Sequence, residues 1–454
     1  MLIRFKLKNL FSFKEETEFN LLPGRIKRLD HHKYERNGIE ILKLSAIYGA
    51  NGSGKSNLIR SLTLLKYLML NGAIQAPLLN QKFRLSKTSQ AEPVELALEF
   101  HVGQSTYYYS VSINDGVIED EYFCSTGPNQ EDVLIFHRVT DNSKNTIRFS
   151  KAFENDPDNQ TLKRVIETDL LKPHQPLFNL LTTITNSAFN DVQIARQWVE
   201  KRLVIISTGT KPNSLAHQLD SKKGFQEFAN NLLCSLSTGI SAIQVETKSL
   251  EAFFGDDNDN EIEEIKVEAK NNPDVVILRR LRKDNDEFTI VNQGGKLVVK
   301  SLFLEHRGEH NENIRFKLNE ESDGTRRLLD YLPAWEELLD SDTTFVIDEI
   351  ERSIHPLIIK ELIEKFSKDI ATKGQLIFST HESTLLDQDI FRTDEIWFAE
   401  KNQQGATKLY SLSDFKEHNT IDIRKGYLTG RYGAIPFLGN LHDLNWHTPP
   451  DETK

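Results

Sequence analysis

The sequence predicts an α/β fold with a strand-rich first part, a helical middle part and a second α/β part. Two observations predict this class. Apolar strand patterns alternate with amphipathic helical patterns between residues 320 and 380, which is typical of a parallel sheet. In addition, the apolar stretch Ile39–Tyr48 runs directly into a glycine-rich loop, and the helical pattern Ser56–Asn71 follows that loop.

The first 154 residues are predicted to form a strand-rich lobe with one embedded helix. Apolar residues at Ile3, Phe5 and Leu7 alternate with polar ones, which predicts a strand within Leu2–Phe13. Five further stretches have strand character: Glu18–Leu22, Val94–His101, Ser105–Ile113, Ile118–Cys124 and Val133–Val139. The helix is the pattern that starts at Ser56, so the lobe contains both the strands and the glycine-rich loop.

The middle part, residues 155–260, is predicted to be a helical insertion. Four helical patterns support this interpretation: Leu162–Leu171, Pro176–Asn186, Asp191–Lys201 and Gly224–Leu236. Heptads are not sustained over several turns, which argues against a long coiled-coil arm. We expect the second α/β part at 261–400 and a C-terminal extension at 401–454. The elements predicted in the second part are Val275–Leu281, Phe288–Val291, Lys296–Leu304, Thr344–Ile350 and Gln375–Ser379 as strands, and Glu320–Leu339 and Pro356–Asp369 as helices.

Composition excludes several classes of protein. The 454 residues carry a net charge of −11, from 56 Lys and Arg against 67 Asp and Glu, so the overall field does not attract nucleic acid. A local basic patch could still bind it. Only two cysteines occur, which is too few for a disulfide framework and favours a reducing, cytoplasmic location. No apolar run reaches the ~18 residues that a membrane span requires.

The strongest motif is the loop Gly49–Ser56, with the sequence GANGSGKS. It fits the G-x-x-x-x-G-K-[ST] pattern in the required context of a preceding strand and a following helix. Glycines allow backbone N–H groups to surround phosphate oxygens, and a helix N-terminus adds partial positive charge. Lys55 is therefore expected to reach the β- and γ-phosphates, and Ser56 to bind Mg²⁺. The nucleotide-binding residues predicted here are Asn51, Gly52, Ser53, Gly54, Lys55, Ser56 and Asn57.

A second motif is an apolar strand, Thr344–Ile347, that ends in the adjacent carboxylates Asp348 and Glu349. Taken alone, such a strand end is usually the entry to a loop. Together with a phosphate loop it predicts a Walker B site, in which Asp348 holds Mg²⁺ through oxygen ligands. Glu349 would then polarise the attacking water, so ATP and Mg²⁺ are the expected cofactors.

A third candidate is His381, which follows the apolar strand Gln375–Ser379. A histidine directly after a strand beside the Walker B strand can contact a γ-phosphate. The alternative is an exposed loop histidine. About one helix and one strand separate Glu349 from His381, which places the two strands side by side.

These motifs together resemble the ABC-type ATPase head of the SMC/RecF/OLD group. The opening Phe5–Phe13 (FKLKNLFSF) is similar to the first strand of that group, whose ATPase head is split by an insertion. The resemblance implies a signature turn, read here at Ser322, Gly324 and Thr325, that contacts the nucleotide bound by a neighbouring subunit. An ordinary N-capped helix is compatible with the same residues. The resemblance also offers Gln81 as a possible metal-contacting residue.

A closer resemblance is to the ATPase subunits of PARIS-type anti-phage defence systems. It rests on residues 24–48 with the loop that follows them, and on the tail Tyr427–Pro436 (YLTGRYGAIP). It implies a homo-oligomeric ATPase that senses a phage-encoded trigger protein and holds and releases a separate Toprim nuclease. Asp387 and Asp389 are interpreted as loop residues, because they lie directly after the loop that carries His381, with no room for a separate fold before them. The stretch after His381 is short for a metal-dependent nuclease domain, so we expect the nuclease to be a separate protein.

The rival hypothesis is a DNA-binding repair ATPase similar to RecF and SMC proteins. The best basic cluster is Arg279, Arg280, Arg282 and Lys283, which could equally be a solvated strand edge. Two further patterns are interpreted as lacking metal. The stretch Asp257–Glu268 imitates a calcium loop but has Ile262 where the turn needs glycine, so we expect an acidic linker. His31 and His32 are expected to be surface residues.

Overall fold

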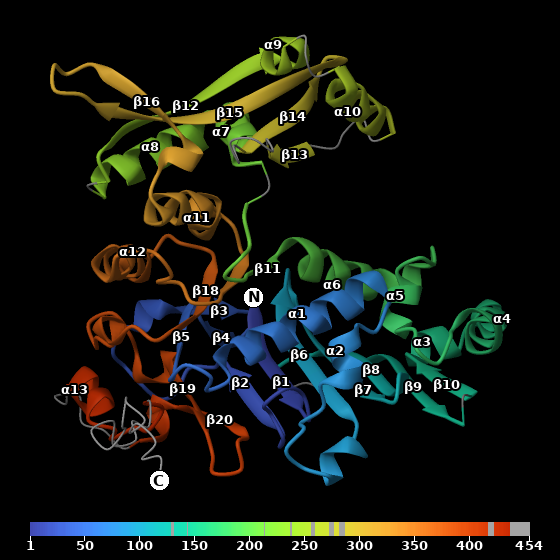
Figure 1. Cartoon of the computed structure of the whole chain (residues 1–454). Coiled ribbons are helices and arrows are strands. Elements are labelled where there is room, and N and C mark those ends of the chain that lie inside the picture. The colour runs from blue at the N-terminus through green and yellow to red at the C-terminus, as the bar shows by residue number, and fades with distance from the viewer. Residues whose placement is uncertain are drawn as a thin grey trace, which may run out of the picture. The chain divides into compact units, whose positions relative to one another are not determined.

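The computed structural model describes residues 1–128, 131–142, 144–212, 214–236, 238–255, 259–271, 277–280, 287–415 and 422–435 (Figure 1). It divides them into two compact units. The terminal unit combines Leu2–Glu200 with the described residues after Phe378, and the central unit is formed by Lys201–Phe378 together with Met1. Within the described ranges, no helix combines the length and the hydrophobicity that a bilayer crossing requires.

The terminal unit contains a seven-stranded sheet in the order β10-β9-β8-β7-β6-β1-β2, and every neighbouring pair in it is antiparallel. The sequence predicted most of these strands. The bounds are β1 Leu2–Lys8, β2 Thr17–Asn20, β6 Val94–Val102, β7 Ser105–Asn114, β8 Val117–Thr126, β9 Val133–Asp141 and β10 Lys144–Phe149.

Aromatic side chains join one face of this sheet to the helices of the terminal unit. Phe100 of β6 stacks on Trp198 of α6 (Asn190–Lys201) with 4.4 Å between ring centroids. Tyr109 of β7 meets Phe178 of α5 (Leu177–Leu181) edge to face. These rings are buried, so they form much of the core. Two shorter helices, α3 (Lys151–Glu154) and α4 (Pro157–Val165), follow β10.

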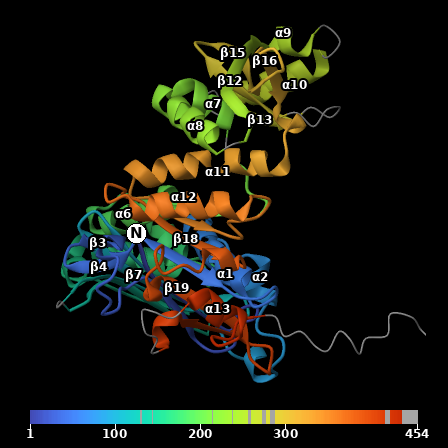
Figure 2. The same cartoon turned by 90° about the vertical axis from the view of Figure 1, so that its left-hand side faces the viewer.

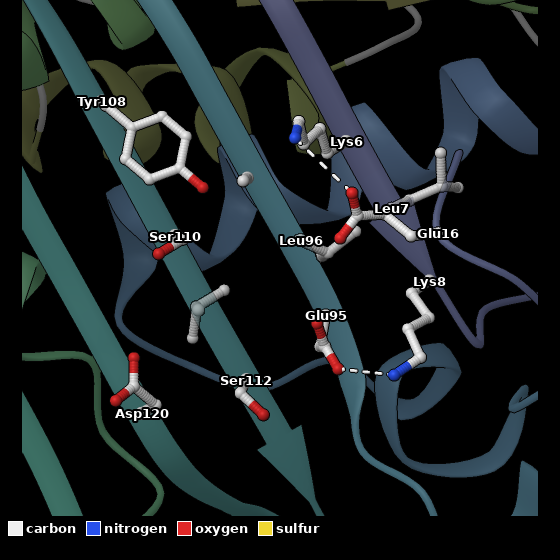
Figure 3. A pocket seen from close by; sticks show the side chains of 12 residues that line it. Lys6, Leu7, Lys8, Glu16, Glu95, Leu96, Tyr108, Ser110, Ser112 and Asp120 are labelled. Atoms are coloured by element: carbon white, nitrogen blue, oxygen red, sulfur yellow. Dashed lines mark hydrogen bonds and ion pairs between the residues drawn. The ribbon is translucent and has the colours of Figure 1, made fainter. Parts of the chain in front are cut away.

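The opposite face of the sheet is polar and lines a groove of about 170 Å³ (Figure 3). Tyr108 belongs to this face, whereas its neighbours in the Tyr107–Tyr109 triplet are fully buried, as the alternation of a strand requires. Lys8 lies 2.9 Å from Glu95, and Lys6 lies 3.2 Å from Glu18. The charges on this face are therefore paired within the sheet.

The remaining strands of the terminal unit lead to the glycine-rich loop. The stretch Ile39–Tyr48, predicted as one strand, is interrupted at Lys43, whose N–H donates to the His32 carbonyl at 2.9 Å. β5 runs parallel to β19, and β20 is antiparallel to β19. The bounds are β3 Lys33–Arg36, β4 Ile39–Leu42, β5 Leu44–Tyr48, α1 Lys55–Asn71, α2 Ala76–Asn80, β19 Ile396–Lys401, β20 Thr407–Ser411 and α13 Ile423–Leu428.

The central unit contains the parallel strands β11 (Leu203–Ile206), β17 (Thr344–Ile347) and β18 (Gln375–Thr380), in that order. The last two residues of β18 already belong to the terminal unit. The helices α11 (Asp323–Asp340) and α12 (Pro356–Lys368) lie side by side, and Trp335 of α11 meets Phe366 of α12 with 6.4 Å between centroids (Figure 2).

A second, antiparallel sheet in the central unit has the order β12-β15-β14-β13, and β16 pairs with the far end of β15. Its core is an apolar cluster that includes Phe254, Ile265, Phe288 and Val299. The elements are α7 Leu215–Ser221, α8 Lys223–Ser235, β12 Ile240–Ser249, α9 Leu250–Phe254, α10 Asp259–Asn271, β13 Ile277–Arg280, β14 Glu287–Gln293, β15 Lys296–Arg307 and β16 Asn313–Lys317.

Helices occupy much of the predicted helical insertion, but β11 and β12 lie among them and were not predicted. The expectation of an acidic linker at Asp257–Glu268 is wrong for the residues that the structure describes, because α10 begins at Asp259. Ile262, Ile265 and Ala269 are spaced along one buried side of this helix. The many carboxylates between them obscured this periodicity in the sequence.

Candidate nucleotide-binding site

The glycine-rich loop connects the buried strand β5 to helix α1, as predicted. Gly49 and Gly54 are required at its two ends because neighbouring atoms leave no room for a side chain. A Cβ on Gly49 would lie 2.4 Å from the Ala399 carbonyl oxygen, and one on Gly54 would lie 2.2 Å from Thr407 Oγ1. Gly54 also has φ of 115°, which disfavours other residues. This tight turn directs the N-terminus of α1 toward the loop.

Lys55 is the first residue of α1, and its side chain folds back over the loop. Its Nζ donates to the Gly49 carbonyl at 2.5 Å and to the Ala50 carbonyl at 3.2 Å. Only 6% of this residue is exposed, so an ammonium group is held at the loop before any ligand binds. Helix α1 has no acidic residue in its first turn, so nothing there offsets the positive helix end.

Thr407 and Ser12, which the sequence did not indicate as site residues, hold the glycine-rich loop through hydrogen bonds. Thr407 begins β20, and its Oγ1 lies 2.8 Å from both the Ser53 carbonyl oxygen and Ser12 Oγ. Its backbone N–H donates to the Ser12 carbonyl at 2.7 Å. Asn57 of α1 donates to Ser12 Oγ at 2.9 Å. Segments from both ends of the sequence therefore hold the loop in place.

We predict that Thr407→Val weakens ATP binding while the fold persists. Valine has nearly the same shape but leaves the Ser53 carbonyl without its hydroxyl donor, which costs about 1–3 kcal/mol for a buried group. Affinity should fall about tenfold in a titration with a fluorescent ATP analogue, and Thr407→Ser should restore it. Thr63→Val is the matched control, because Thr63 Oγ1 donates to the Ile59 carbonyl within α1.

The Walker B strand, β17, is fully buried and ends at Ile347, so Asp348 follows the strand directly, as predicted. Asp348 is 7% exposed, and its backbone N–H donates to the Ile206 carbonyl of β11 at 2.9 Å. Glu349 follows with φ of 51°, in the left-handed region that a non-glycine residue enters only at a cost of about 1–3 kcal/mol. Strained backbone conformations are concentrated at functional sites, so this one supports a functional role for Glu349.

The loop after β11, residues 207–210, was missed by the sequence analysis. It lies beside the Walker B turn because β11 runs parallel to β17. Arg352 donates to the Thr208 carbonyl at 3.1 Å, and Arg327 of α11 donates to the Thr210 carbonyl at 3.1 Å. The loop therefore connects the Walker B turn to helix α11 within the central unit.

The predicted signature turn is an N-capped helix start. Ser322 is the N-cap of α11, and its Oγ accepts the Thr325 N–H at 3.1 Å. Gly324 packs against the residues that follow Walker B, since a Cβ there would lie 2.7 Å from the Ser353 carbonyl oxygen. His306 of β15 lies 2.6 Å from Glu321, which precedes the turn. The second sheet of the central unit therefore contacts the residue that precedes the signature turn.

Asp330 of helix α11 is expected to make the stability of the protein depend on pH. Burial raises the pKa of its carboxyl group from 3.8 to about 6, although Arg327 lies 3.8 Å away and opposes the shift. Because the folded protein binds this proton more tightly, stability is lost as pH rises from about 4 to about 6. Asp330→Asn should remove this loss, which amounts to at most about 3 kcal/mol. Urea unfolding at pH 4 and pH 8 should show a gain for the variant only at pH 8.

The other predicted residues occupy the loop and the ends of strands. Asn51, Gly52 and Ser56 are exposed, and Ser53 is buried. His381 is exposed directly after β18. Gln81 directly follows helix α2, and its carbonyl accepts the Phe11 N–H at 2.7 Å. The loop and His381 belong to the terminal unit, whereas Walker B and the signature turn belong to the central unit.

Candidate Mg²⁺ ligands are the exposed hydroxyl of Ser56 and the carboxylate of Asp348, both hard oxygen donors. No three His, Cys, Asp or Glu residues in the described part of the chain gather closely enough to hold a metal alone.

Two other sequence interpretations have clear outcomes, and a third falls partly outside the described residues. His32 is not a surface residue: it is fully buried, and its Nδ1 lies 2.9 Å from Glu395 Oε1, where burial lowers the pKa of His32 to about 3. The turn at Asp387 and Asp389 is confirmed as a loop, and Arg28 pairs with Asp389. In the basic cluster, Arg282 and Lys283 lie outside the described residues.

The family model for "AAA domain, putative AbiEii toxin, Type IV TA system" matches residues 44–387. The chain belongs to this AAA family. The match includes the phosphate loop, the Walker B strand, the signature turn and His381. Together with the sheets described above, it confirms the predicted fold class, an α/β P-loop ATPase head with a strand-rich lobe. Among curated proteins, none matches the chain.

Solved SMC head domains are also similar to this AAA-family chain. An SMC head bound to the C-terminal winged-helix domain of ScpA has 13% identity and a TM-score of 0.45, over 90% of this chain and 97% of that one. The SMC head of Thermotoga maritima has 14% identity and a TM-score of 0.40, over 90% and 98%. An SMC head from Pyrococcus furiosus, bound to the C-terminal domain of ScpA, has 13% identity and a TM-score of 0.39, over 95% and 98%.

Proposed function

We propose that this AAA-family chain binds and hydrolyses ATP at sites shared between two copies of itself. The observation that carries the proposal is the phosphate loop, in which Lys55 is held against the loop carbonyls at the N-terminus of α1. An ammonium group and the N-terminus of a helix at one point form a site for a polyphosphate. ATP is the proposed substrate.

In the proposed site, Lys55 binds the β- and γ-phosphates, and Glu349 orients the attacking water. His381 contacts the γ-phosphate from the end of β18. Ser56 and Asp348, with Gln81 as a weaker candidate, would hold Mg²⁺, which neutralises charge on the phosphates. The second copy supplies Ser322, Gly324 and Thr325, whose helix N-terminus points positive charge at the transferred phosphoryl group.

A mixing experiment tests the shared site. Lys55→Ala removes the phosphate lysine, and Ser322→Arg blocks the signature turn, so each full-length variant should be inactive alone. When equal amounts are mixed, some interfaces combine an intact Lys55 with an intact Ser322. Phosphate release should return to about a quarter of the wild-type rate if subunits mix at random in a symmetric assembly. A mixture that stays inactive, or full activity of either variant alone, contradicts the proposal.

We further infer that the ATPase serves as sensor and scaffold of an anti-phage defence complex. The resemblance to PARIS-type ATPase subunits supports this role, and the family description names a putative AbiEii toxin of a type IV TA system. The partner would be a separate Toprim nuclease, released when a phage-encoded protein is sensed. Co-purification of a Toprim nuclease with the wild-type chain, and its loss when a trigger protein is added, is the expected result.

The rival function, a DNA repair ATPase, predicts a different response. Duplex DNA should then stimulate phosphate release, and the stimulation should fall steeply as salt is raised. The chain has a net charge of −11, which disfavours this behaviour. ATP turnover that is independent of DNA between low and physiological salt supports the defence role.

A further inference from the structure

Strand β12 forms one edge of the antiparallel sheet in the central unit. It pairs with β15 along its whole length, from Ile240 opposite His306 to Ser249 opposite Val298 (Figure 1). No described strand pairs with its other side. A ten-residue edge strand is long for an unpaired edge, which soluble proteins usually shorten or cover.

Helix α8 covers only the first part of this edge. Ile243 N–H donates to Asn230 at 2.7 Å, and the Ser241 carbonyl accepts from Cys234 Sγ at 3.3 Å. Both partners belong to α8, so the odd-numbered residues of β12 direct their backbone groups away from β15. The same alternation turns the backbone groups of Val245, Thr247 and Ser249 outward.

The outward N–H and C=O of Val245 and Thr247, and the outward N–H of Ser249, have no hydrogen bond in the part of the chain that the structure describes. Thr247 and Ser249 are also exposed. Since α8 covers the strand up to Ile243 and α9 begins at Leu250, the open edge is the segment Val245–Ser249.

We propose that this open edge pairs with the same segment of a second copy, antiparallel and symmetric about Thr247. In this register the two Thr247 residues exchange both of their backbone hydrogen bonds. Ser249 N–H of each copy donates to the Val245 carbonyl of the other. A two-fold axis relates the copies, so the contact closes on itself and joins two sheets into one.

Side-chain charges favour this register over the others. Glu246 and Lys248 lie on the same face of β12, with Lys248 Nζ 2.7 Å from Glu246 Oε2 within one copy. Symmetry about Thr247 places Glu246 opposite Lys248 of the second copy, in a non-hydrogen-bonded pair with Cα atoms about 4.5 Å apart. Opposite charges across strands stabilise a pair, and like charges destabilise it. A parallel, in-register pairing would place like charges side by side.

The contact does not depend on the proposed ATP site, because it involves only the second sheet of the central unit. The test therefore uses the full chain without nucleotide, in sedimentation equilibrium over a range of concentrations. A short edge of this kind should give a dimer in the micromolar range, typical of small interfaces. A wild-type mass that stays monomeric up to about 100 μM, well above that range, overturns the proposal.

Thr247→Pro tests the backbone pairing. Proline is tolerated on an edge strand where the N–H faces solvent, so the monomer should keep its circular dichroism spectrum and melting temperature. The dimer should be lost. Lys248→Glu should weaken the dimer at least tenfold, and adding Glu246→Lys to it should restore wild-type association. Dimerisation that is unchanged by both Thr247→Pro and Lys248→Glu contradicts the proposal.

Cysteine cross-linking tests the register itself. The background is Cys234→Ser, because Cys234 is exposed and the other cysteine, Cys124, is buried. Thr247→Cys places two thiols opposite each other, with Cα atoms about 5.5 Å apart, within the range of a disulfide. Mild oxidation should give a covalent dimer. Ser249→Cys is the matched control, since it faces Val245, and equal cross-linking of the two variants would overturn the register.

Discussion

Replacement of Glu349 by glutamine is expected to leave ATP binding intact and to abolish turnover. A glutamine amide has the same size as the carboxylate but cannot accept a proton from the attacking water. General-base contributions are typically on the order of 10² to 10⁴ in rate, so phosphate release should fall by at least about a hundredfold. The backbone strain at φ of 51° is the same for both residues, so folding should not change.

Two measurements separate this role from a structural one. Equilibrium binding of ATP should stay within a factor of about two of wild type, well below the tenfold change that one lost charge-assisted hydrogen bond would cause. Single-turnover phosphate release should nevertheless be slow. Glu361→Gln is the matched control, because Glu361 is an exposed carboxylate on α12 in the same unit. Normal turnover in Glu349→Gln would show that Glu349 does not activate the attacking water.

The phosphate loop could be predicted because its chemistry is local. Eight consecutive residues, Gly49–Ser56, specify the turn, the helix start and the lysine, and the flanking strand and helix have clear periodicity. The structure confirms this arrangement from β5 to α1. The Walker B strand could be predicted for the same reason, since an apolar strand and two carboxylates are adjacent in the sequence.

The support behind the loop could not be predicted, because it depends on residues far apart in the chain. Ser12 and Thr407 are separated by 395 positions, and neither residue type suggests a role by itself. His32 was misplaced for a related reason. Its partner Glu395 lies 363 residues away, and only the tertiary fold shows that this pair is buried. Sequence periodicity predicts which face of an element is buried, but it does not show which polar residues meet there.

Short elements were missed where their local signal was weak. β11 has only four residues, and its pairing with β17 gives it its structure. That pairing places the loop 207–210 beside Walker B. Lys43 interrupts the predicted strand Ile39–Tyr48 because its backbone N–H bonds to the carbonyl of His32. Tertiary hydrogen bonds therefore set these boundaries more than local propensity does.

Lys55→Ala is expected to weaken ATP binding at least about tenfold and, with it, every nucleotide-dependent property of the chain. The ammonium group is already positioned at 2.5 Å from the Gly49 carbonyl, so little ordering is needed when phosphate oxygens replace the carbonyls. Hydrogen bonds to charged groups are worth about 1.5–3 kcal/mol each, so affinity should fall about tenfold to a hundredfold or more. A fluorescent ATP analogue should report this loss directly.

The variant also loses the two contacts from Lys55 to the loop, so its apo stability has to be separated from its binding. Saturating ATP should raise the melting temperature of the wild type, because a ligand at 100 times its Kd stabilises by about 2.7 kcal/mol. The same ATP concentration is at most about ten times the Kd of Lys55→Ala after a tenfold loss of affinity, so it should stabilise this variant by no more than about 1.4 kcal/mol, whatever its melting temperature without ligand. Lys66→Ala, on the same helix α1, should respond like the wild type. If ATP raises the melting temperature of Lys55→Ala as much as that of the wild type, the phosphates are bound elsewhere. The proposal of a shared ATP site at the phosphate loop is then contradicted. If only the apo stability falls, Lys55 is a structural residue of the loop.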